Sequence, residues 1–128
     1  EDGLETRDFV HVDDVARALY ACLTSSEPEN RVINVGSGIA TTVIDVANLL
    51  IASLNGSAPV RITSEYRLGD IRHNVADIDR LKDILPGGPK IGLADGINQC
   101  AAWVKTQPIP EDQLDHANTE LRQRKLMA

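Results

Sequence analysis

The polar loop at residues 66–73 contains side chains that could bind a nucleoside diphosphate. Its sequence is Tyr66-Arg67-Leu68-Gly69-Asp70-Ile71-Arg72-His73. An arginine can hold a phosphate through two parallel hydrogen bonds. The carboxylate of Asp70 can accept hydrogen bonds from both vicinal hydroxyls of a ribose, and Gly69 lets the backbone turn. The same residue types are also typical of a solvent-exposed Arg–Asp ion pair, so the loop alone leaves both interpretations open.

The glycine turn at residues 36–38 is a second candidate, because it follows a strand-like stretch and precedes a predicted helix. A dinucleotide-binding fingerprint requires a third glycine three residues after the second, and Thr41 stands at that position. No acidic residue follows a second strand about 20 residues further on, where the ribose-binding carboxylate would be needed. We therefore interpret Gly36 and Gly38 as a strand-to-helix turn rather than as an NAD site.

The remaining reactive side chains do not predict a self-sufficient active site. His11, His73 and His116 are the only histidines, and His11 reads as a structural residue before a helix. Neither Cys22 nor Cys100 lies beside a plausible base, and the chain has no Gly-x-Ser-x-Gly or Cys-x-x-Cys pattern. We predict no catalytic, cofactor-binding or metal-ligating residues, and we expect both cysteines to be buried, reduced thiols.

The elements that must position these residues alternate between strand and helix. Strand-like runs are expected at residues 9–12, 31–35 and 60–63, and helices at about 14–24, 43–54, 77–85, 93–106 and 111–125. Asp13, Thr42 and Asp77 are predicted N-caps, and Asn55 begins the stop of the second helix. The predicted inward faces are Val15, Ala18, Leu19 and Cys22, then Val43, Val46, Ala47 and Leu50, then Ile97, Ala101 and Val104. This small number of strands indicates an α/β fragment that packs against a partner domain missing from this chain.

Composition places the 128 residues in the ordinary globular class, with 42% hydrophobic and 25% charged residues. The formal net charge of −6 argues against nucleic-acid binding. Arg122, Arg124 and Lys125 are interpreted as the cationic last turn of a helix. No apolar run predicts a membrane span or a signal peptide, so we expect a cytoplasmic protein.

Three segments in order resemble the extended short-chain dehydrogenase/reductases that act on nucleotide sugars, the NAD-dependent epimerase/dehydratase family. Residues 6–18, TRDFVHVDDVARA, resemble the family pattern R-D-[FY]-[VI]-[HY]-V-x-D-[VL]-A. Residues 32–38, VINVGSG, resemble [VF]-[FYI]-N-[VIL]-G-[ST]-G, and residues 66–78 resemble [YR]-R-x-G-D-[VI]-R followed by [AS]-D. The resemblance covers residues 1 to about 107.

The resemblance implies the smaller C-terminal substrate-binding domain of such an enzyme, spanning residues 1–128, with a few short strands and about five helices. It implies that Arg7 and Arg67 reach the diphosphate of a nucleotide sugar and that Asp70 meets its ribose. Asn34, Gly36 and Gly38 receive no binding role. The tail from Pro110 onward is similar to some epimerase-like members, so a sugar 4-epimerase is preferred, with transient oxidation and re-reduction of the sugar.

The chain departs from the family in lacking the glycine-rich cofactor turn and the Tyr-x-x-x-Lys pair, because Thr24 follows Tyr20 and Asp70 follows Tyr66 at that spacing. We therefore expect the N-terminal Rossmann domain to be missing and the fragment to be inactive. NAD is expected only in the full-length enzyme. The alternatives are part of a nucleotide-sugar 4,6-dehydratase, or a non-enzymatic module of the same fold that binds a partner protein. Homo-oligomer formation stays open.

Overall fold

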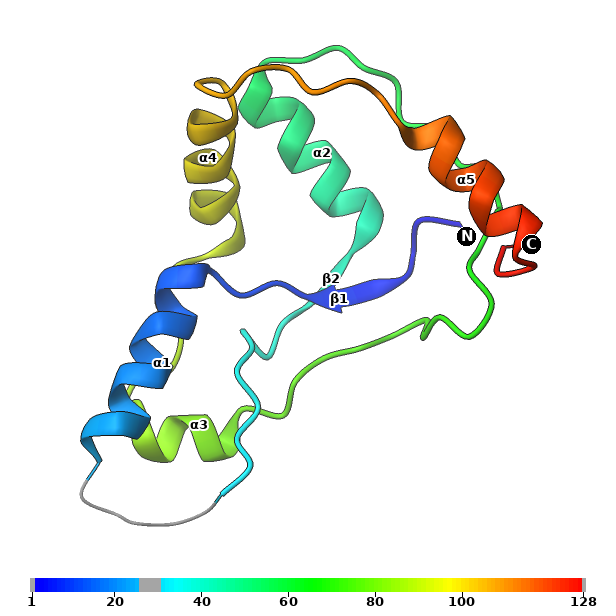
Figure 1. Ribbon diagram of the computed structural model, residues 1–128. Coiled ribbons are helices and arrows are strands. Elements are labelled where there is room, and N and C mark those ends of the chain that lie inside the picture. The colour runs from blue at the N-terminus through cyan, green and yellow to red at the C-terminus, as the bar shows by residue number, and fades with distance from the viewer. Residues whose placement is uncertain (1, 26–30, 128) are drawn as a thin grey trace.

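The computed structural model describes residues 2–25 and 31–127. Within them the chain forms five helices and a two-stranded sheet, joined by irregular segments (Figure 1). In chain order they are β1 (Thr6–Asp8), α1 (Val12–Thr24), β2 (Ala40–Thr42), α2 (Val43–Leu54), α3 (Asp79–Ile84), α4 (Leu93–Val104) and α5 (Leu114–Gln123). This confirms the predicted α/β class with about five helices and few, short strands. None of these helices is long and apolar enough to cross a membrane.

The sheet lies at the centre of the molecule and joins segments that are far apart in the sequence. β1 and β2 pair antiparallel, with Thr6 opposite Thr42, Arg7 opposite Thr41 and Asp8 opposite Ala40. The other edge of β1 pairs in parallel with the loop at residues 72–74 through a bridge between Thr6 and His73. β1 is therefore the central element that fixes the loop against the rest of the chain.

The helices pack as two separate pairs around this centre, α1 with α3 and α2 with α4, while α5 lies apart from both pairs (Figure 1). Each pair has its own small core. Buried apolar side chains in the described part of the chain are Ala18, Leu81, Ile97 and Ala101. With so few apolar residues buried, the helices depend on polar anchors as well as on packing.

Polar side chains mark where the helices begin and end. His11, rather than the predicted Asp13, is the N-cap of α1, and its Nδ1 accepts a hydrogen bond from the N–H of Asp13. Thr42 caps α2 as predicted, and Asn55 ends that helix with a left-handed φ of 53°. The N-cap of α3 is Ile78 rather than the predicted Asp77, although Asp77 still accepts a hydrogen bond from the N–H of Asp79.

The three predicted strand-like runs were wrong. Residues 9–11 are irregular and Val12 is already helical, while residues 31–35 and 60–63 form no strand. The observed strands lie instead at residues 6–8 and 40–42. β-branched residues favour a strand only when a partner supplies the ladder and the packing, and the described residues offer no partner strand to these runs.

The predicted inward faces are only partly buried. The exposed members of these faces are Leu19, Cys22, Val43, Leu50 and Val104, and Cys100 is exposed too, which corrects the prediction of buried thiols and complete helix faces. The chain exposes 9536 Å², whereas a compact monomer of 13.9 kDa is expected to expose roughly 6,700 Å². The excess arises because each helix pair covers one side of its helices and leaves the other open.

Candidate functional site

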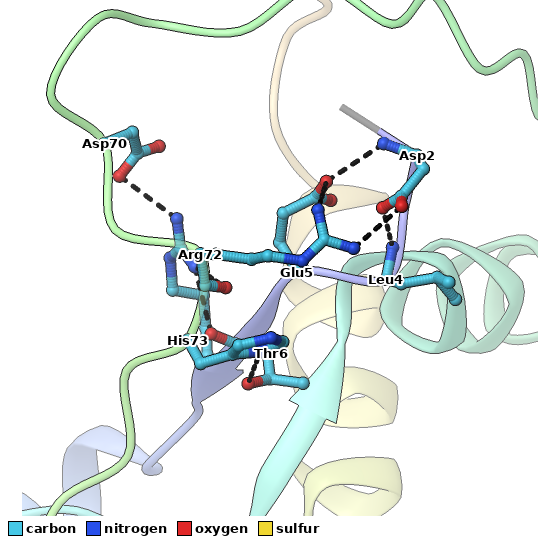
Figure 2. Close-up of polar contacts among 8 residues, drawn as sticks. Asp2, Leu4, Glu5, Thr6, Asp70, Arg72 and His73 are labelled. Atoms are coloured by element: carbon cyan, nitrogen blue, oxygen red, sulfur yellow. Dashed lines mark hydrogen bonds and ion pairs between the residues drawn. The ribbon is translucent and has the colours of Figure 1, made fainter.

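Backbone pairing between β1 and residues 72–74 brings together two of the segments that resemble the family, residues 6–18 and 66–78. The N–H of Thr6 donates to the carbonyl of Arg72 at 3.0 Å, and the N–H of Asn74 donates to the carbonyl of Thr6 at 3.1 Å. Thr6 Oγ1 also lies 2.9 Å from His73 Nδ1 (Figure 2). This pairing sets the register of the loop, so Asp70 lies beside Arg7.

Arg7 and Asp70, two of the predicted binding residues, form an ion pair. The Nη2 of Arg7 lies 3.1 Å from Asp70 Oδ1, and Nη1 donates to the carbonyl oxygens of Thr6 and Arg72, both at 3.0 Å. The side chains are 26% and 41% exposed. Three acceptors thus orient the Arg7 guanidinium, while the exposed part of each side chain can still reach a ligand.

Arg67, the third predicted binding residue, lines a cleft with Asp70. The cleft has a volume of about 320 Å³ and is lined by Asp2, Glu5, Ser64, Tyr66, Arg67, Asp70 and Arg72. Arg7 lines a separate cleft of about 510 Å³ with Asp8 and parts of residues 33–36 and 74–76. The Arg7–Asp70 ion pair therefore links two clefts, with Arg67 in one and Arg7 in the other.

Three carboxylates and two guanidinium groups line the first cleft, and one of the two arginines has no ion-pair partner in the described ranges. Arg72 donates to Asp2 at 2.7 Å and lies 3.9 Å from Glu5 Oε1, as Figure 2 shows. The hydrogen bond from Arg72, helped by the N–H of Leu4, lowers the pKa of Asp2 to about 2. Arg67 forms no ion pair with any residue in the described ranges, so its guanidinium is free to meet an anion.

Asp8, to which the sequence analysis gave no role, is the most connected side chain beside these residues. Its carboxylate accepts hydrogen bonds from Ser37 N–H at 2.6 Å, Ser37 Oγ at 2.6 Å, Gly38 N–H at 2.9 Å and Ala76 N–H at 3.1 Å. Burial raises the pKa of this carboxyl, and the four hydrogen bonds more than offset that, so the pKa lies below its usual value. Asp8 therefore ties β1 to two distant segments. Its position directly after Arg7 was the one feature of the sequence that could have drawn attention to Asp8.

The glycine turn at residues 36–38 is explained by Asp8. A Cβ on Gly36 would lie 2.5 Å from the Ala76 Cβ and 2.6 Å from Asp8 Oδ2, so only glycine fits this close approach. Gly38 has a φ of 73°. The N–H groups that a phosphate-binding turn would present to a dinucleotide donate to Asp8 instead, so this turn does not fit the pyrophosphate of NAD. Asn34 also bonds internally, donating to the carbonyl of Asp77 at 3.3 Å.

Asp14 plays a comparable structural part at α1. It is buried, accepts hydrogen bonds from the N–H groups of Lys90 and Ile91 at 2.9–3.1 Å, and pairs with Arg17 at 2.5 Å. Burial raises the pKa of Asp14, but these donors outweigh it and the pKa lies below its usual value. Asp14 thus anchors α1 to the segment before α4.

Comparison with known proteins identifies the family. Residues 1–36 match the model of the NAD dependent epimerase/dehydratase family. The chain is 35% identical over 104 residues to a dTDP-L-rhamnose 4-epimerase from Burkholderia thailandensis and 31% identical over 102 residues to a dTDP-glucose 4,6-dehydratase from Streptomyces griseus. These matches cover 81% and 80% of this chain, and 28% and 31% of the relatives.

A solved structure of UDP-glucose 4-epimerase with UDP-glucose from Thermotoga maritima superposes with a TM-score of 0.72 and 32% identity. The match covers 82% of this chain and 33% of that one. The chain is similar in sequence and in fold to the NAD-dependent epimerase/dehydratase family, which confirms the resemblance seen in the sequence. It spans about a third of the length of these relatives.

Proposed function

We propose that this chain is the C-terminal, nucleotide-sugar-binding part of an NAD-dependent sugar 4-epimerase. The observation that carries the proposal is the position of Asp70, which pairs with Arg7 from a segment about 60 residues away and shares a cleft with Arg67. In this account Arg67 and the exposed edge of Arg7 bind the diphosphate. Asp70 accepts hydrogen bonds from the ribose hydroxyls of the nucleotide.

The chemistry of the substrate fits these groups. A diphosphate offers several anionic oxygens, and a guanidinium binds such oxygens through charge-assisted hydrogen bonds. Arg67 has no competing ion-pair partner among the described residues. Asp70 would keep one carboxylate oxygen on Arg7 while the other meets a hydroxyl. The relatives named above act on dTDP- and UDP-sugars, which supports a nucleotide sugar as the ligand class.

The chemical step is assigned to the longer protein of which we propose this chain to be a part. NAD supplies transient oxidation at a sugar carbon, followed by re-reduction. The chain's own residues bind and orient the nucleotide end of the substrate. A 4,6-dehydratase is the second candidate, favoured by the match to the Streptomyces griseus enzyme.

A thermal-shift panel tests the proposed ligand. This chain is heated with UDP-glucose, dTDP-glucose or a GDP-sugar, and with NAD as the negative control. A ligand that binds only the folded state raises the melting midpoint as its concentration exceeds Kd. We expect a shift with at least one nucleotide sugar and none with NAD. Equal shifts with NAD and the sugars, or no shift with any sugar, would count against binding by this chain.

A further inference from the structure

The end of the chain folds back onto the loop that carries Arg67 and Asp70. After α5, Lys125 takes a left-handed φ of 56°. The N–H of Leu126 donates to the carbonyl of Leu121 at 2.9 Å, and the N–H of Lys125 donates to that of Arg122 at 3.0 Å. These two bonds define a Schellman motif, which ends a helix and turns the chain aside. Residues 126–127 therefore leave α5 in a direction set by this turn.

Two contacts join α5 and residues 126–127 to residues 65–68. The N–H of Leu68 donates to the carbonyl of Leu126 at 3.0 Å, and this pairing places Arg67 opposite Met127 in an antiparallel bridge. The guanidinium of Arg122 also pairs with Glu65. We use the name C-terminal clasp for Arg122, Leu126 and Met127.

The clasp holds the first two residues of the turn at residues 67–70. The N–H of Asp70 donates to the carbonyl of Arg67 at 3.1 Å, and Gly69 has a φ of 84°, as expected at the third position of a type II turn. A Cβ on Gly69 would meet nothing within 4 Å, so no packing holds the turn from that side. Beyond the turn, β1 holds residues 72–74. The turn is thus held on one side by β1 and on the other by the clasp.

We propose that the C-terminal clasp is the element that positions Arg67 and Asp70 for the nucleotide sugar, an inference that rests on the proposed function. The clasp fixes the backbone of Arg67 itself and of its neighbour Leu68. Without it, only the β1 side of the loop would be anchored, and Arg67 would be the first residue released. Residues of the tail would then control affinity without touching the ligand.

The test uses two substitutions at Lys125 in the full 128-residue chain. Lys125→Pro forbids the positive φ and so breaks the turn that directs residues 126–127, whereas Lys125→Gly permits that φ and is the matched control. Hydrogen exchange at the Leu68 amide reports on the clasp without any ligand. We expect exchange about tenfold faster in Lys125→Pro, and a Kd for UDP-glucose raised about fivefold by the loss of anchoring. Lys125→Gly should leave the Kd near that of the wild type.

A second pair of variants tests the contribution of the ion pair between Arg122 and Glu65. Arg122→Gln should weaken UDP-glucose binding, whereas Arg124→Gln, which removes only the pair with Glu120 inside α5, should not. Unchanged Leu68 exchange in Lys125→Pro would overturn the inference, and so would faster exchange with unchanged affinity. A wild-type chain that fails to bind UDP-glucose would count against the proposed function, while Leu68 exchange would still decide whether the clasp orders the loop.

Discussion

Replacing Arg67 by Ala should lower the affinity for the nucleotide sugar at least tenfold. A charge-assisted hydrogen bond contributes about 1.5–3 kcal/mol, which corresponds to roughly 10- to 150-fold in Kd. Arg67 is the clearest position for this test because its guanidinium makes no ion pair with the described residues. Its loss should therefore affect the ligand more than the fold. Calorimetric titration of the chain with UDP-glucose measures the effect, and in the longer enzyme the same change should raise KM.

Arg61→Ala is the matched control for that experiment. Arg61 is an exposed arginine six residues before Arg67, and it lines neither the cleft that contains Arg7 nor the cleft that contains Arg67. It should bind the sugar as the wild type does. Arg7→Ala is a poorer test because Arg7 also bonds the carbonyls of Thr6 and Arg72, so its loss would release the loop. If Arg67→Ala and Arg61→Ala both bind within twofold of the wild type, Arg67 does not bind the diphosphate.

Asp8→Asn should destabilise the fold by about 2–3 kcal/mol, because hydrogen bonds to a charged group are each worth more than neutral ones. The carboxylate accepts four hydrogen bonds from Ser37, Gly38 and Ala76. An asparagine offers one acceptor oxygen and turns an NH₂ group toward N–H donors. Urea unfolding of both proteins measures the change in the free energy of unfolding.

The pH dependence gives an independent check on Asp8. Its pKa in the folded chain lies below the ordinary value of 3.8, so the carboxylate stabilises the fold above about pH 4. That contribution is lost as the pH falls through the lower, folded-state pKa, and Asp8→Asn should therefore flatten the stability curve in this acid range. Asp79→Asn, an exposed carboxylate that pairs within α3, serves as the control. An equal loss of stability in both variants would contradict the special role of Asp8.

Local signals in the sequence were sufficient for the helices and for the family. Thr42 and Asn55 mark the two ends of α2, because an N-terminal side-chain cap and a C-terminal residue with left-handed φ act over only a few residues. Gly69 marked the turn that carries Asp70 for the same reason. The family resemblance implied that Arg7 and Asp70 serve one ligand, but it did not predict their ion pair, since no local rule connects residues so far apart.

The strands and the polar anchors could not be predicted in this way. Residues 31–35 have β-branched side chains, yet a strand forms only against a partner, and β1 pairs with residues 40–42 and 72–74 instead. Cys22 and Leu19 lie on an apolar helix face, but the packing of α1 against α3 leaves them exposed. Asp8 shows no unusual local pattern. Its importance comes from donors 29 to 68 residues away.

The central claim is that β1 and the loop at residues 66–73 together hold the nucleotide sugar. Amide chemical shifts of the ¹⁵N-labelled chain, followed during titration with UDP-glucose, test it most directly because every backbone N–H reports separately. We expect saturable changes concentrated at Arg7 and at residues 67–73, with little change at Ser37 and Gly38, whose N–H groups donate to Asp8. Changes centred on residues 36–38, with none at Arg7 or residues 67–73, would contradict it.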